Sequence, residues 1–179
     1  CECALQLASL GHRIKLYEMR AGNLSTPAHK TKEFAELVCS NSFGTLAEIS
    51  APGQLKWEAE KLGSFVLQSA LSAKVPAGQA LGVDRVLFAN KLTQWVSHHP
   101  NIEVIPEAVT TLADLPRPAV IATGPLTHEP FAQQLLEHFG DEFLYFFDAI
   151  APVIAADSID TSIAWRADRW DKGTPDYLN

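Results

Sequence analysis

The chain has 179 residues, of which 47% are hydrophobic and 20% charged, an ordinary composition for a globular domain. Its 14 basic and 21 acidic residues give a formal net charge of −7. This charge argues against non-specific polyanion binding by the segment as a whole, because such binding needs a basic footprint. Three cysteines do not form a secreted disulfide framework and favour a reducing compartment, so a cytoplasmic location is expected. No apolar run approaches the roughly 18 residues that span a bilayer, so no membrane partner is expected.

The first elements resemble half of a dinucleotide-binding unit. Apolar residues in 1–10 fall on one helical face, Gly11 follows as a C-cap, and residues 13–18 alternate as a strand that ends in Glu18. A helix, a glycine turn and a strand ending in a carboxylate form the second half of a βαβ nucleotide unit. Because the chain starts at Cys1, we expect the first strand and its Gly-x-Gly-x-x-Gly motif to precede it, which would put Glu18 at roughly the usual 20-residue distance.

The middle of the chain is predicted to be mainly helical. Residues 33–38 predict one or two helical turns, and the apolar spacing in 54–73 predicts one amphipathic helix that residues 75–78 break. A further helix is predicted over 85–98, with Pro100 beyond its end. Its inward residues are expected to be Val86, Ala89, Leu92, Trp95 and Val96.

The last third returns to strands. Residues 102–105 predict a short strand, and residues 116–124 predict a buried strand that runs into a glycine turn. Thr127 is expected to cap a helix that ends at Phe139, and residues 143–156 are apolar and β-prone. The recurring order of strand, helix and strand places the chain in the α/β class.

Two positions next to predicted strands have the chemistry of a nucleotide site. Glu18 would accept hydrogen bonds from a ribose hydroxyl, although a solvated carboxylate at a strand end is an equally good interpretation. Thr123 and Gly124 end the predicted strand over 116–124, where a glycine lets the backbone approach a ligand closely. An ordinary turn explains these two residues equally well.

Cys39 is the candidate reactive residue, because it lies in a polar stretch with Ser40, Asn41 and Ser42. Hydrogen-bond donors favour the thiolate, which is the reactive form, whereas a small buried residue is the common role of a lone cysteine. Cys1 and Cys3 are expected to pack. The six histidines lack zinc-ligand spacing, so no metal is expected.

A small basic cluster lies near the end of the chain. It is expected to be a solvated face, with an RNA contact as the alternative. Its members are Arg166, Arg169 and Lys172.

Several short motifs, taken together and in this order, resemble one family across essentially the whole chain. The family is the bacterial folate- and FAD-dependent tRNA uracil-5 methyltransferases, flavoproteins related to the glucose-inhibited division protein. The motifs are LYEMR (16–20), TPAH (26–29), FAELVCSNS (34–42), VPAG (75–78), VDR (83–85), ATGPLT (122–127), DKG (171–173) and YLN (177–179). Residues 43–53 and Gln79 depart from the family pattern near the expected flavin pocket.

The resemblance implies transfer of a one-carbon unit from methylenetetrahydrofolate to C5 of a uridine in the tRNA T-loop. Reduced FAD would carry the methylene and the reducing equivalents, and NADH or NADPH would re-reduce it. By the same resemblance, residues 1–145 are part of a Rossmann-like FAD-binding domain and residues 146–179 begin an inserted substrate domain. The segment alone is expected to be inactive. The alternatives are a non-catalytic FAD- or nucleotide-binding module and a plain α/β interaction domain.

The resemblance also assigns individual residues. Glu18 and Arg20 would bind FAD, with Glu18 on the ribose, and Thr123 and Gly124 would lie near the cofactor. Ser40 and Asn41 would lie beside the flavin ring. Cys39 resembles one of two functional cysteines of the family, and the other is expected beyond Asn179.

Overall fold

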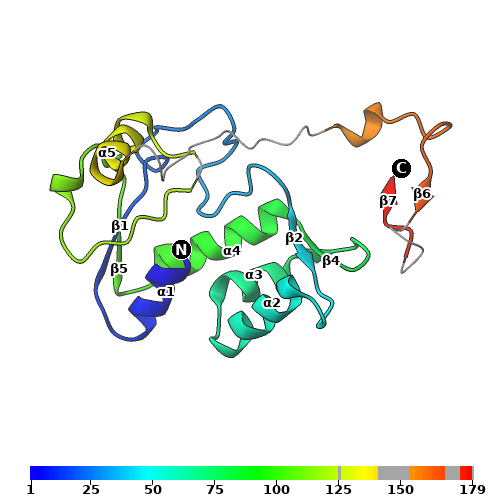
Figure 1. Cartoon of the computed structure of the whole chain (residues 1–179), viewed down its shortest axis with the longest axis horizontal. Helices are drawn as coiled ribbons and strands as arrows, with labels where there is room; N and C mark the ends of the chain where they lie inside the picture. The colour runs from blue at the N-terminus through cyan, green and yellow to red at the C-terminus, as the bar shows by residue number, and fades with distance from the viewer. Residues whose placement is uncertain (125, 141–153, 168–173, 179) are drawn as a thin grey trace.

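A computed structural model describes residues 1–124, 126–140, 154–167 and 174–178 (Figure 1). In these ranges the chain forms helices and short strands in the mixed order of an α/β protein. The helices are α1 (Glu2–Ser9), α2 (Ala51–Lys61), α3 (Phe65–Ser72), α4 (Arg85–His98) and α5 (Glu129–Phe139), with short 3₁₀ turns η1 (Leu112–Asp114) and η2 (Ala156–Ser158). The strands are β1 (Ile14–Tyr17), β2 (Ser42–Thr45), β3 (Lys74–Val75), β4 (Ala80–Val83), β5 (Ile102–Ile105), β6 (Arg166–Ala167) and β7 (Tyr177–Leu178).

A parallel pair of strands forms one centre of the molecule. β1 pairs with β5 from Ile14 opposite Ile102 to Tyr17 opposite Ile105. Helices α1 and α4 pack against this pair (Figure 1). Since the two strands are parallel, the segments that leave them start from the same edge.

The second sheet is antiparallel, and the chain enters it as β2 shortly after residue 40. Its order is β2-β4-β3, with Ser42 opposite Gly82 and Lys74 opposite Val83. The tight turn between β3 and β4 was predicted only as a helix break. Together, the two sheets make the fold mixed rather than purely parallel.

One hydrophobic core joins helices α1, α3 and α4 to both sheets. Phe88 and Leu92 of α4 are fully buried, and the Phe88 ring lies 5.3 Å from that of Phe43 on β2. Burial of each large apolar side chain stabilises the fold by about 1.5–3 kcal/mol. The remaining core residues are Ala4, Leu5, Ala8, Phe34, Leu67, Ala70, Ala73, Leu81, Val83, Val96 and Ile102.

The prediction of one helix over 54–73 is wrong, because the chain turns between α2 and α3. Gly63 adopts φ +69°, a left-handed conformation that ends α2. Ser64 then caps α3 by accepting a hydrogen bond from Leu67 N. The carboxylate of Glu2 on α1 accepts further hydrogen bonds from Phe65 N and Val66 N. Because α3 begins at this break, Glu2 can join α1 to the first residues of α3.

Two other local predictions are wrong. Residues 33–38 form turns instead of a helix, because Ala35 has φ +57°, which an α-helix excludes. Residues 116–124 form no strand: Val120 is 69% exposed, and the segment has no paired strand among the described residues. An apolar β-branched run becomes a strand only when a neighbour satisfies its backbone.

The helix ends and faces were predicted with small errors. α4 spans 85–98 as expected, but Val86 is exposed and Phe88 points inward instead. The helix that ends at Phe139 starts after His128, and Thr127 donates to Gly124 O rather than capping it. Most of the apolar stretch 143–156 lies outside the described residues, as does the predicted domain boundary near 145.

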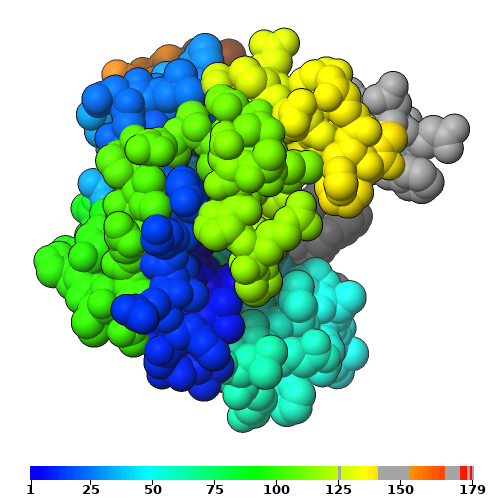
Figure 2. Space-filling model, turned by 90° about the vertical axis from the view of Figure 1, so that its left-hand side faces the viewer, coloured from blue at the N-terminus to red at the C-terminus, as the bar shows by residue number. Residues whose placement is uncertain are grey.

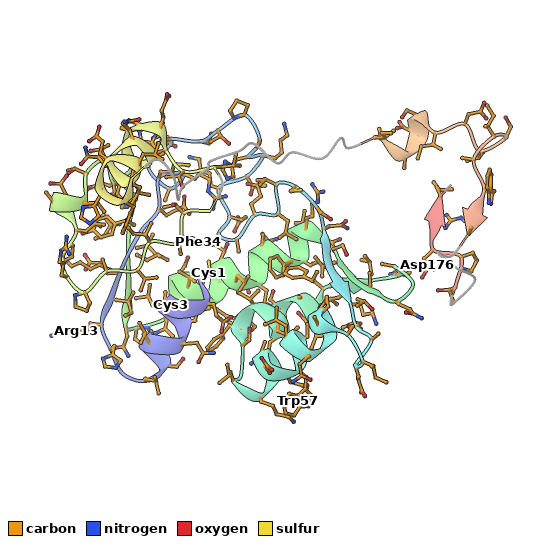
Figure 3. The ribbon with its side chains drawn as sticks, in the orientation of Figure 1. Cys1, Cys3, Arg13, Phe34, Trp57 and Asp176 are labelled. Atoms are coloured by element: carbon orange, nitrogen blue, oxygen red, sulfur yellow. The ribbon has the colours of Figure 1, made fainter. Side chains whose placement is uncertain are left out.

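The last described segment touches the antiparallel sheet. β6 and β7 pair with each other, and Asp176 Oδ2 accepts a hydrogen bond of 2.8 Å from Gly78 N in the β3–β4 turn (Figure 3). Within the described ranges, no helix combines the length and apolar character needed to cross a membrane.

Candidate functional site at the carboxyl edge of the parallel strands

The candidate site lies where β1 and β5 end. Glu18 directly follows β1, and its backbone N–H donates to Ile105 O at 3.0 Å. Gly22 approaches the backbone of Pro106 so closely that a Cβ would overlap the Pro106 carbonyl oxygen. Figure 2 shows the segment after β5 alongside the N-terminal residues, with α5 above them. In open α/β sheets, ligands bind outside the carboxyl ends of the strands.

An ion-pair network occupies this edge. Arg20 donates to Glu18 through its backbone N–H (3.0 Å), Nε (3.1 Å) and Nη2 (3.1 Å). Its Nη1 donates to Glu36 at 3.3 Å. The side chains of Arg20, Glu18 and Glu36 are only 7%, 18% and 11% exposed. Two carboxylates and one guanidinium leave the cluster with one net negative charge.

The surroundings keep both carboxylates ionised at neutral pH. Burial acts to raise the pKa of Glu18, but hydrogen bonds and charge from Arg20 outweigh it, so this pKa lies below its ordinary value. Burial likewise opposes ionisation of Glu36, while amide hydrogen bonds from Lys30 and Thr31 bring its pKa below the ordinary value. Burial and the Arg20 charge lower the pKa of His29, which favours the neutral imidazole.

The cysteine segment lies between two anchors. Phe34 is buried, and its N–H donates to Thr93 Oγ1 on α4 at 2.8 Å. At the other end, Asn41 exchanges two hydrogen bonds with Val83 of β4. Cys39 and Ser40 between them are exposed, and Ser40 Oγ accepts from Ser42 N. Cys39 is therefore an accessible thiol on an anchored loop and not a packing residue.

The Asn41 side chain is partly committed to the fold. Its Nδ2 donates to Val83 O at 3.0 Å, which leaves Oδ1 as the other polar atom of the amide. If Asn41 lies beside a flavin ring as predicted, its polar contact with the ring must therefore come from Oδ1 or from the backbone.

Thr123 and Gly124 form an exposed turn. Thr123 Oγ1 and Thr127 Oγ1 are hydrogen-bonded at 2.6 Å, and Gly124 has φ +70°. A Cβ on Gly124 would meet nothing within 4 Å, so the space above it is open. The described hydrogen bonds do not bring this turn to the network of Glu18 and Arg20.

Sequence reasoning missed three residues of this edge. Glu36 lies inside a quoted motif but was not selected, Gly22 gave no signal of its close approach, and His29 is hydrogen-bonded to Thr26 within the TPAH motif. A carboxylate three residues before the cysteine was the available signal for Glu36.

Other predicted residues are placed as follows. Cys3 is exposed, so its expected packing role is wrong, whereas Cys1 packs at the edge of the core. Arg166 is exposed, and Arg169 and Lys172 lie outside the described residues.

Within the described ranges, no group of three or more metal-binding side chains occurs. A surface hollow of about 380 Å³ between α1, α2 and α3 is separate from the candidate site.

Comparison with known proteins identifies the family. The family model described as glucose inhibited division protein A matches residues 1–179. The chain belongs to the glucose inhibited division protein A family. The resemblance found in the short motifs is thereby confirmed.

Curated proteins of one name are similar along nearly the whole chain. The chain is 66% identical over 178 residues to the methylenetetrahydrofolate--tRNA-(uracil-5-)-methyltransferase TrmFO of Bdellovibrio bacteriovorus. It is 52% and 48% identical to the proteins of the same name from Sulfurihydrogenibium sp. and Aquifex aeolicus. Each match covers 99% of this chain and 40% of the relative, so the chain spans about two fifths of the length of these relatives.

Proposed function

We propose that the full-length protein carrying this chain methylates C5 of a T-loop uridine in tRNA, with methylenetetrahydrofolate as the one-carbon donor. The observation that supports this most is the 66% identity, over 99% of the chain, to a relative whose name states that reaction class. The chain itself would supply part of an FAD-binding domain of Rossmann type. A domain division near residue 145 remains a prediction.

The carboxyl edge of β1 fits the adenosine half of FAD. A carboxylate offers about four acceptor positions, and Arg20 uses three of those on Glu18, so one position on Oε2 remains for a ribose hydroxyl. The buried Arg20 is already paired with two carboxylates, and the cluster is net negative. Such a cluster favours a hydroxyl over the 2′-phosphate of an NADP-type nucleotide.

The remaining site residues extend this proposal along the cofactor. Thr123 and Gly124 would border FAD, because the open space at Gly124 lets a ligand approach the backbone. Ser40 and Asn41 would lie beside the flavin ring. When bound, FAD would supply the carrier and redox chemistry, with NADH or NADPH as the source of electrons.

Cys39 would act at the flavin face, either as a base toward the C5 proton of the uracil or as a thiol that guards the activated cofactor. Its exposure and its anchored loop support this role. The three cysteines are free, which supports a reducing, cytoplasmic location.

The decisive experiment uses the purified full-length protein. Its absorption spectrum reports bound flavin, and transfer of label from methylenetetrahydrofolate to tRNA reports activity. Flavin binding without transfer would favour the alternative, a non-catalytic FAD-binding module. A protein with neither property would overturn the proposal.

A variant locates the cofactor. Glu18→Ala removes the ribose acceptor, and a hydrogen bond to a charged group is worth about 1.5–3 kcal/mol. FAD affinity should therefore fall at least about tenfold in a flavin-fluorescence titration. Unchanged affinity would remove Glu18 from the site.

A further inference from the structure

Arg20 is placed where it contacts carboxylates on two sides. Its side chain is 7% exposed, and its guanidinium lies 3.1 Å from Glu18 Oε2 and 3.3 Å from Glu36 Oε2. Nε also donates to Glu18 Oε1, so the guanidinium holds both oxygens of that carboxylate. Paired hydrogen bonds of this kind fix the plane of a carboxylate as well as its position.

Glu36 is itself fixed from the other side. Its Oε1 accepts from Lys30 N at 2.7 Å, and its Oε2 accepts from Thr31 N at 3.2 Å in addition to Arg20. The loop that carries Glu36 is anchored to α4 through Phe34 N and Thr93. Glu36 is therefore a rigid anchor for the guanidinium.

We propose that Arg20 is a positioning residue for the nucleotide rather than a direct contact: it holds the Glu18 carboxylate with its free acceptor toward the ribose, and Glu36 holds Arg20. This inference rests on the proposed function, because it assumes that the ribose of FAD binds Glu18. It changes the role that the family resemblance implies for Arg20. It also assigns a role to Glu36, which lies in the FAELVCSNS motif but was not selected from the sequence.

A double-mutant cycle between Glu18 and Arg20 tests the inference, with FAD affinity of the full-length protein as the readout. Glu18→Ala and Arg20→Gln should each weaken FAD binding by about tenfold or more. If Arg20 acts only through Glu18, adding Arg20→Gln to Glu18→Ala should change affinity by less than about twofold, because independent effects add and dependent ones do not. Additive losses would show that Arg20 contacts FAD and would overturn the inference.

The Glu36 arm uses a matched control in the same loop. Glu36→Gln should weaken FAD binding severalfold in the wild-type background and by less than about twofold in the Arg20→Gln background. Glu33→Gln removes the same charge three residues earlier, where no ion pair to Arg20 exists, and should leave affinity unchanged. An equal loss in both variants would attribute the effect to the loop in general and overturn the role of Glu36.

Two measurements separate this inference from folding defects and from the proposed function. Arg20→Lys keeps a cation between the carboxylates without the fork, so its FAD affinity should fall between those of the wild type and Arg20→Gln. Equal affinities of Arg20→Lys and Arg20→Gln would count against positioning. A wild-type protein that binds no FAD would refute the proposed function, whereas wild-type binding with additive losses refutes only the positioning role.

Discussion

Asn41 and Val83 are joined by two hydrogen bonds in opposite directions. Val83 N donates to Asn41 O at 2.9 Å, and Asn41 Nδ2 donates to Val83 O at 3.0 Å. Val83 is fully buried in β4, so its carbonyl depends on the Asn41 amide. This pair ties the end of the cysteine segment to the antiparallel sheet.

Asn41→Ala should lower the free energy of unfolding by about 1–3 kcal/mol, because it leaves the Val83 carbonyl without its donor. Denaturant unfolding of the full-length protein measures this. Ser40→Ala is the matched control. Among the described residues, Ser40 Oγ accepts one hydrogen bond, an exposed one from Ser42 N, so its change should stay within about 0.5 kcal/mol. Equal stabilities of the two variants would contradict the role of Asn41.

Glu2 gives the fold a pH dependence. Burial acts to raise the pKa of Glu2, but hydrogen bonds from Val66 N, Gln6, Ser64 and Phe65 N outweigh it, so the folded-state pKa lies below the ordinary value. The ionised carboxylate therefore stabilises the fold above the pKa of the unfolded chain, about 4, and this stabilisation is lost as the pH falls through the folded-state pKa.

Glu2→Gln should destabilise the protein by about 1 kcal/mol at pH 7, as loss of a helix cap does. The difference from wild type should shrink as the pH falls below about 4. Thermal unfolding at several pH values measures it, with the exposed Glu60→Gln on α2 as the control. A difference that is constant with pH would exclude the carboxylate charge as its cause.

Gly22→Ala should distort the carboxyl edge of the parallel strands. The added Cβ overlaps the Pro106 carbonyl oxygen, so the segments after β1 and β5 must separate, at a cost of about 1–3 kcal/mol. FAD affinity should fall along with stability, because Glu18 lies on the displaced segment.

Gly11→Ala separates these two effects. Position 11 has open space for a Cβ, but its φ is +91°. The variant therefore loses stability through backbone strain, at a position away from the carboxyl edge of β1 and β5. It should keep the wild-type FAD affinity in the same titration. A Gly22→Ala variant that also keeps it would place the cofactor elsewhere.

Cys39→Ala should leave stability nearly unchanged, because the thiol is exposed. Methyl transfer to tRNA should fall by about 10²–10⁴-fold if the thiol acts as a positioned base. Label incorporation and the flavin spectrum of the full-length variant measure the two effects together, with the exposed Cys3→Ala as the control. Near-normal transfer with intact flavin would remove Cys39 from the mechanism.

Elements with strong local signals were predictable. α4 has its predicted bounds because Asp84 caps it, accepting hydrogen bonds from Val86 N and Leu87 N, and Pro100 follows it. β1 followed by Glu18 was predictable from alternation and from the preceding glycine turn. These features depend on neighbours in the sequence.

Features that depend on distant partners were not predictable. β2 exists because it pairs with β4, and residues 116–124 remain irregular without a paired strand. In the candidate site, the position of Glu18 was predictable because the alternating residues 13–18 already indicated the end of a strand. The ion pair between Glu36 and Arg20 joins residues 16 positions apart, and it forms only when the loop that carries Glu36 folds back toward β1.

The hydrogen bond from Gly78 to Asp176 joins residues 98 positions apart. Ribosomes add about 5–20 residues per second, so the β3–β4 turn emerges about 5–20 s before its carboxylate partner has been synthesised. During that interval the Gly78 amide has only water as a partner for this bond. During synthesis the turn is therefore held by the β3–β4 pairing and by the hydrogen bond from Ala80 N to Ala77 O, and the contact with Asp176 is a late addition to a hairpin that is already formed.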